Sequence, residues 1–216
     1  MKLKNIFLAA TAVAFLGAQA SHASIAFGPE GNKFMLAADL GISLGKVYGD
    51  GVPDGSGIEG IAGFTGGITG SYHFSPYIGV FAGLNYTERG YSVDGSGIEG
   101  RVTADYIDIP VGITFNYSGI AAVKSYTNIG ALVAIPMGDF EGQDDVTGKA
   151  KSSVGFGLHL DSYAAFPVAE NIHVGPKVWM DWVFTNINGE DSPNDEDVND
   201  VDFGIGLAVS IDFPAS

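Results

Sequence analysis

Polar and charged residues recur at alternate positions in several parts of the chain, and one such pair could do chemistry. His159 and Asp161 are two residues apart, a spacing that places both side chains on one face of a β-strand. A hydrolase would also need a serine nucleophile within hydrogen-bond reach of the histidine. Ser162 faces the opposite side of that strand, and only a guessed strand order brings Ser210 nearby. A lipid-modifying deacylase or acyltransferase therefore stays a hypothesis, and no catalytic residue is assigned.

A structural interpretation covers more of these residues. The polar faces of the expected strands carry one arginine, one lysine, one histidine and several aspartates: Asp39, Arg89, Asp108, His159, Asp161, Lys177, Asp181, Asp202 and Asp212. Buried charges need partners, because an unpaired one costs several kcal/mol. We expect Arg89 and Lys177 to bridge the carboxylates as a polar network in the lumen of a barrel. A narrow path for ions is the functional alternative.

An acidic segment near the C-terminus could bind a divalent cation. Residues 188–200 are rich in oxygen ligands, and the candidate Ca²⁺ ligands are Asp191, Asp195, Asp197 and Asp200. The segment lacks the glycine that an EF-hand loop requires at its sixth position. A solvated acidic loop is the alternative, so the metal is unknown, and no cofactor is expected.

Strands are the elements that would position these residues. From Val201 to Phe213, apolar residues alternate strictly with small or acidic ones, as in a half-buried strand. Similar alternation marks seven further segments: 33–46, 61–74, 77–89, 106–115, 122–136, 154–166 and 171–185. We therefore expect eight strands.

The connections between these strands alternate in length. Three are short, at 75–76, 117–119 and 168–171, whereas about 47–59, 90–100, 138–150 and 187–199 are long. Six aromatic residues fall at the short-turn end: Phe74, Tyr77, Phe115, Tyr117, Phe166 and Phe213. These features predict an all-β fold, an eight-stranded antiparallel up-and-down transmembrane β-barrel with short periplasmic turns and long external loops.

The sequence Asp-Gly-Ser-Gly-Ile-Glu-Gly occurs twice, at Asp54 to Gly60 and at Asp94 to Gly100. Each copy is expected to end a long external loop, one before the second strand and one before the fourth. Glycine-rich polar segments suit tight turns. We interpret the repetition as a marker of topology and assign no ligand to it.

The N-terminus and the composition support export. Lys2 and Lys4 precede an apolar run that ends in small residues, which predicts a secretory signal peptide over 1–23, cleaved after Ala20 or Ala23. The run is short for a membrane-anchoring helix, the alternative. Residues 24–216 would then form one barrel domain. The chain has no Cys and a net charge of −15, so neither thiol chemistry nor nucleic acid binding is expected.

The last strand carries the most specific motif. Gly206, Val209 and Ile211, followed by Phe213, are similar to the Gly-x-x-Φ-x-Φ signal that the barrel-assembly machinery reads, although Pro214, Ala215 and Ser216 follow the aromatic residue. Residues 106–111 are similar to the extended aromatic-x-x-Ile-Pro stretch common in the family's middle strand. On these motifs the chain resembles the small, porin-like outer-membrane β-barrel domain family.

The resemblance implies a monomer in the outer membrane, with membrane lipid, lipopolysaccharide and the assembly machinery as partners. It implies a structural or surface-interaction role and no enzyme activity. A small pore or carrier for ions or apolar solutes is the alternative function. A soluble, lipocalin-like secreted carrier is the main alternative on fold.

Overall fold

The computed structural model describes residues 33–48, 58–95, 98–118, 123–138, 140–144, 149–150, 153–184 and 199–214. The predicted signal peptide lies outside these residues. The strands are β1 (Lys33–Tyr48), β2 (Ile58–Gly60), β3 (Ala62–His73), β4 (Ile78–Gly95), β5 (Ile98–Ser118), β6 (Lys124–Pro136), β7 (Phe140–Asp144), β8 (Lys149–Ala150), β9 (Gly155–Ala169), β10 (Ile172–Val183) and β11 (Asn199–Pro214). No helix in the described part of the chain is long and apolar enough to cross a membrane.

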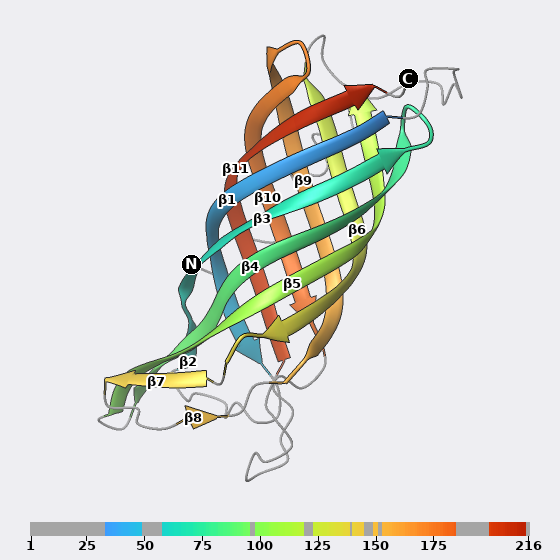
Figure 1. Cartoon of the computed structure of the whole chain (residues 1–216). Coiled ribbons are helices and arrows are strands. Elements are labelled where there is room, and N and C mark those ends of the chain that lie inside the picture. The colour runs from blue at the N-terminus through green and yellow to red at the C-terminus, as the bar shows by residue number, and fades with distance from the viewer. Residues whose placement is uncertain are drawn as a thin grey trace.

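Eight long strands close into an antiparallel barrel (Figure 1). Each of β1, β3, β4, β5, β6, β9, β10 and β11 pairs with two neighbours, and β1 completes the ring by pairing with both β3 and β11. Full closure leaves no unpaired edge, which is the condition for strands to cross a bilayer. The eight predicted strands and the predicted fold class are confirmed.

The two sides of the barrel wall differ in polarity because side chains alternate along each strand. On β1, Leu40 is 63% exposed, and on β11 Leu207 is also 63% exposed, whereas their neighbours Asp39 and Ala208 face inward and are buried. The barrel is therefore apolar outside and polar inside. A water-soluble carrier of apolar ligands needs the reverse arrangement, so the lipocalin-like alternative does not fit.

Aromatic side chains gather toward both ends of the apolar wall. At the short-turn end, Phe34 and Phe213 on paired strands place their ring centroids 5.9 Å apart. At the other end, Trp182 and Phe184 meet edge to face with centroids 6.2 Å apart. Rings at these heights are typical of the two membrane–water interfaces.

The strand pair β4–β5 continues well beyond the barrel at the long-loop end, as the lower left of Figure 1 shows. It is joined there by β2, which pairs with β4, and by β7, which pairs with β5 and with β8. We call β2, β7, β8 and the β4–β5 segment 90–103 the outer ribbon. The prediction of a long loop at 90–100 was therefore wrong, since residues 90–95 and 98–100 are strand.

The two copies of the repeated sequence meet in the outer ribbon. Residues 58–60 of the first copy pair with 91–93 of β4, and residues 98–100 of the second copy pair with 93–95 on its other side. The identical Ile-Glu-Gly triplets thus flank one strand as its two partners. Only the end of the first copy, 58–60, lies among the described residues. In the second copy residues 94–95 and 98–100 are strand, so this copy does not end a long loop.

Candidate functional site

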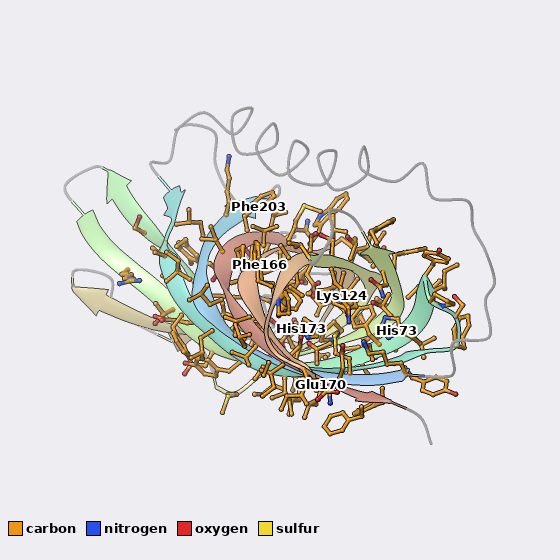
Figure 2. All side chains as sticks on the ribbon, turned by 90° about the horizontal axis from the view of Figure 1, so that it is seen from above. His73, Lys124, Phe166, Glu170, His173 and Phe203 are labelled. Carbon is orange, nitrogen blue, oxygen red and sulfur yellow. The ribbon has the colours of Figure 1, made fainter. Side chains whose placement is uncertain are left out.

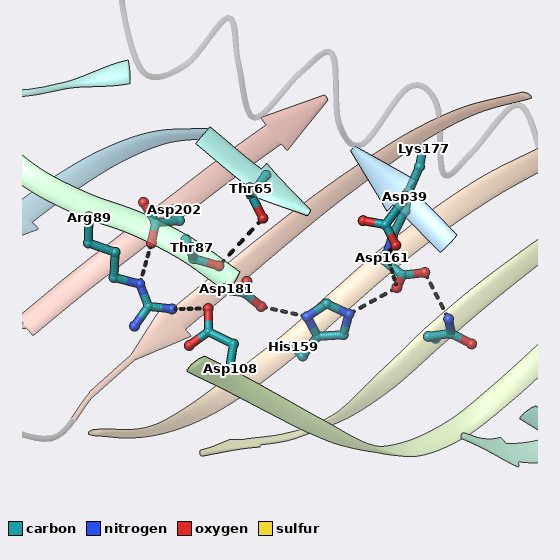
Figure 3. Close-up of polar contacts among 11 residues, drawn as sticks. Asp39, Thr65, Thr87, Arg89, Asp108, His159, Asp161, Lys177, Asp181 and Asp202 are labelled. Atoms are coloured by element: carbon teal, nitrogen blue, oxygen red, sulfur yellow. Dashed lines mark hydrogen bonds and ion pairs between the residues drawn. The ribbon is translucent and has the colours of Figure 1, made fainter. Parts of the chain in front are cut away.

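The nine residues predicted for the inward faces all lie inside the barrel, and none is more than 7% exposed. Asp212 lies at the short-turn end, apart from the other eight: Asp39, Arg89, Asp108, His159, Asp161, Lys177, Asp181 and Asp202. They come from β1, β4, β5, β9, β10 and β11, so the strand period alone turns them toward the axis. In the structure they form two connected groups, one near the long-loop end and one at mid-height (Figure 3).

The outer group is organised by Arg89. Its Nη2 donates to Asp108 Oδ2 at 2.9 Å, and its Nε donates to Asp202 Oδ2 at 2.8 Å. Asp200 Oδ2 lies 3.4 Å from the same Nε. The guanidinium carbon also stands 4.9 Å from the ring centroid of Tyr106, a cation–π distance. One buried guanidinium group thus pairs with three carboxyl groups.

The mid-height group centres on His159. Its Nδ1 lies 2.5 Å from Asp181 Oδ1, and its Nε2 lies 2.9 Å from Asp161 Oδ2. Both ring nitrogens can meet ionised carboxylates only as donors, which makes this histidine an imidazolium. Lys177 Nζ donates to Asp39 Oδ2 at 2.9 Å and lies 3.4 Å from Asp161 Oδ2.

Together the two groups hold Arg89, Lys177 and the His159 imidazolium against six aspartates: Asp39, Asp108, Asp161, Asp181, Asp200 and Asp202. The lumen at this height is therefore rich in carboxyl groups. Ions passing through it would have to break charge-assisted hydrogen bonds in a poorly hydrated space.

The geometry does not support the hydrolase alternative. The two nitrogens of His159 already face carboxylates. The hydroxyl of Ser162 is 3.4 Å from that of Thr127, and the hydroxyl of Ser210 is 3.3 Å from that of Tyr163. Neither serine is the partner of His159.

Large rings fill part of the remaining lumen. Trp179 of β10 is buried and packs over glycine positions on β1 and β11. A Cβ at Gly204 would lie 1.9 Å from the Trp179 ring, so only glycine leaves room for that indole. Closer to the short-turn end, the rings of Tyr126 and Tyr163 are stacked with centroids 6.1 Å apart.

The predicted cation loop is only partly described. Asp191, Asp195 and Asp197 lie outside the described residues. Asp200 is not in a loop: it belongs to β11, is 2% exposed and pairs with Arg89. Strand alternation with Asp202 turns it inward, so it is not an external ligand. No group of three or more His, Cys, Asp or Glu residues in the described ranges is placed to hold a metal ion.

The candidate assembly motif lies on β11, which closes the barrel against β1. Val209, Ile211 and Phe213 point outward and are exposed, whereas Gly206 faces inward. The outward side chains are thus available on the surface of the closing strand, and recognition by the assembly machinery stays a prediction.

A second charged cluster, at the short-turn end, includes residues that sequence reasoning missed. We call Lys33, His73, Lys124, His173 and Asp212 the inner basic cluster. Lys124 Nζ donates to Asp212 Oδ2 at 3.1 Å, Lys33 Nζ donates to the same oxygen, and His173 Nδ1 lies 3.8 Å from it. The alternation of inward and outward residues along a strand could have identified these residues in the sequence. Lys33 shares the inward face of its strand with Asp39, and His73 shares that of its strand with Ser71.

A family model described as outer membrane protein beta-barrel domain matches residues 18–216. This chain belongs to that family. Its fold and its family together place it in the outer membrane. No match was found among curated proteins.

Three solved structures show the same fold at low sequence identity. The outer membrane protein OprG from Pseudomonas aeruginosa aligns at a TM-score of 0.56 and 13% identity, over 86% of this chain and 98% of that one. Outer membrane protein AlkL in lipid bilayers gives 0.52 and 12%, over 91% and 97%. A major outer membrane protein from Thermus thermophilus gives 0.50 and 14%, over 84% and 99%.

Proposed function

We propose that this outer-membrane barrel is a sealed support that holds the outer ribbon above the membrane for contact with external ligands. The observation that carries the proposal is the contrast between its two parts. The lumen is crossed by buried ion pairs, whereas the β4–β5 hairpin extends beyond the barrel and gathers three further strands.

The ion pairs support a sealed lumen because they occupy its interior and link strands that are not neighbours in the ring. Arg89 is on β4 and Asp202 is on β11, and these strands are separated in the ring by β3 and β1. Lys177 on β10 reaches Asp39 on β1, past β11. Eight-stranded barrels enclose only enough space for their own side chains, and here charged side chains link strands that are not neighbours in the ring.

The outer ribbon supports a surface role because strands beyond the barrel add nothing to its closure. The sheet order places β2 at one end and β8 at the other. The end of β1 lies against the second side of β2, where the Gly45 N–H donates to the Ile61 carbonyl at 3.2 Å, so β8 is the terminal strand with a neighbour on one side only among the described residues. Terminal strands of this kind can accept an extended segment of another protein by main-chain hydrogen bonding. We therefore favour extended protein segments as external ligands.

Shortening the hairpin tests this role. In the variant, residues 91–102 are replaced by Asn-Gly, a two-residue hairpin turn, and the control carries Lys46→Gln on the outer wall. Cells displaying each chain are exposed to an array of immobilised extracellular-matrix proteins. We expect the native and control chains to bind at least one of them and the shortened chain to lose that binding.

The shortened chain must still show heat-modifiable gel mobility, the sign of an intact barrel. Equal binding by a correctly folded shortened chain would overturn the surface role of the hairpin, as would no binding by the native chain. Cation-selective conductance would instead support the pore alternative, because the carboxyl groups outnumber the cations in the lumen.

A further inference from the structure

The inner basic cluster reverses the charge balance of the rest of the protein. The chain has 25 acidic residues and 10 lysines and arginines. In this cluster two ammonium groups, those of Lys33 and Lys124, share a single oxygen of Asp212. One positive charge is therefore left uncompensated within the cluster even when both of its histidines are neutral.

Two buried side chains, one in the cluster and one beside it, have polar atoms without a hydrogen-bond partner in the described ranges. His73 is 4% exposed, and neither of its ring nitrogens has a hydrogen-bond partner among the described residues. The hydroxyl of Tyr126, whose ring centroid lies 5.8 Å from that of His73, is likewise without one within the described ranges. Buried polar groups are normally satisfied. The second oxygen of Asp212, Oδ1, is also without a partner in the described ranges, so the one carboxylate of the cluster does not reach His73 or Tyr126. A ligand with several acceptor oxygens would reach them.

The cluster is reachable from the short-turn side. The side chains of Lys33 and Lys124 are 28% and 36% exposed, whereas those of His173 and Asp212 are 4% and 5% exposed. The lysines thus form a rim, with the histidines below it. Figure 2, seen toward this end, shows Lys124 and His173 within the ring of strands.

A group of packed buried side chains lies deeper in the barrel than the two lysines. It consists of five packed side chains: Met35, Tyr126, Tyr163, Ala165 and Ala208. The two exposed lysines, Lys33 and Lys124, begin β1 and β6 at the short-turn end of the barrel. In an outer-membrane barrel that side faces the periplasm.

We propose that the inner basic cluster is a periplasm-facing binding site for a phosphate oxyanion. A carboxylate offers two oxygens, and the cluster already contains one carboxylate, that of Asp212. A phosphate group offers more acceptors, enough for the two ammonium groups, His73 and the Tyr126 hydroxyl together. The phosphate could be free inorganic phosphate or the headgroup of an anionic phospholipid, since both present the same oxygens.

The test is ³¹P NMR and calorimetric titration of the full chain refolded in a non-ionic detergent. The probes are inorganic phosphate, short-chain phosphatidylglycerol and acetate. We expect saturable binding of a phosphate probe, weaker binding of acetate, and a loss of affinity of at least about tenfold in Lys33→Gln/Lys124→Gln. The control Lys46→Gln changes a lysine on the outer wall of β1 and should bind as the native chain does.

The two phosphate probes identify the source. Tighter binding of inorganic phosphate assigns the site to the free anion, and tighter binding of phosphatidylglycerol assigns it to a lipid headgroup. If the double variant fails the gel-mobility test, His73→Gln replaces it. The absence of saturable phosphate binding by the native chain would overturn the proposal, as would equal affinity for acetate or equal loss in Lys46→Gln.

Discussion

Replacing Arg89 by leucine should destabilise the barrel more than any other single charge removal in the lumen. The side chain is 1% exposed and contacts Asp108, Asp200 and Asp202 at 2.9, 3.4 and 2.8 Å. Leucine retains much of the volume but leaves three buried carboxyl groups without their cation. Removing one partner of a buried pair typically costs 3–5 kcal/mol, so we expect a loss of about 4 kcal/mol in the free energy of unfolding.

The assay is urea unfolding of the refolded chain in lipid vesicles, followed by the fluorescence of Trp179 and Trp182, the two tryptophans of the chain. Arg101→Leu is the matched control, because Arg101 lies in the outer ribbon, where its Nη2 donates to the Ala62 carbonyl at 3.0 Å. Its loss should change the free energy of unfolding by about 1 kcal/mol or less.

Neutralising the aspartates that Arg89→Leu leaves unpaired should restore part of the lost free energy of unfolding. Asp108→Asn and Asp202→Asn, combined with Arg89→Leu, remove the charges that leucine leaves unpaired, so the triple variant should be more stable than the single one. If Arg89→Leu lies within about 1 kcal/mol of the native chain, or if the triple variant is less stable than the single one, the pairing would not be the stabilising feature we describe.

Three further predictions follow from the wall and the lumen. Gly204→Ala should lower the free energy of unfolding by about 1–3 kcal/mol, because the new Cβ would meet the Trp179 ring. Adding Trp179→Leu to Gly204→Ala should relieve part of that loss. Additive losses in the double variant would contradict the packing of Trp179 on Gly204. Leu207→Arg, on the outer face of β11, should cost about 2–4 kcal/mol in vesicles if that face contacts lipid, whereas no loss in vesicles would contradict that contact. Lipid A from cells that carry His159→Ala should have the same mass spectrum as lipid A from cells that carry the native chain. A difference between the two spectra would support the enzymatic alternative.

The alternation of apolar and polar residues predicted the eight strands and predicted that their charged side chains face inward. This was possible because the backbone of a strand turns successive side chains to opposite sides. The alternation could not say which residues form pairs, since pairing depends on strand tilt and register around the barrel. Arg89 and Asp202 are 113 residues apart in the sequence, and they meet only because the ring closes.

Strand ends were predicted least well, and composition explains why. Gly90, Gly95 and Gly97 made the β4–β5 tip resemble a loop, although the pairing with β2 and β7 extends both strands there. Asp200 was assigned to the acidic loop because its charge matched that loop, but ladder pairing begins at Asn199. Lys33 and Lys124 each begin a strand, and the phase of that strand places their side chains on the inward face.

Single-channel recording in planar bilayers is the most direct test of the sealed lumen. The refolded native chain, inserted at a density confirmed by heat-modifiable mobility, should give no steady conductance steps in potassium chloride. Lys177→Ala should open intermittent, cation-selective steps, because it removes the buried ammonium group that links β10 to Asp39 on β1 and leaves carboxyl groups in excess. Steady conductance by the native chain would contradict the account.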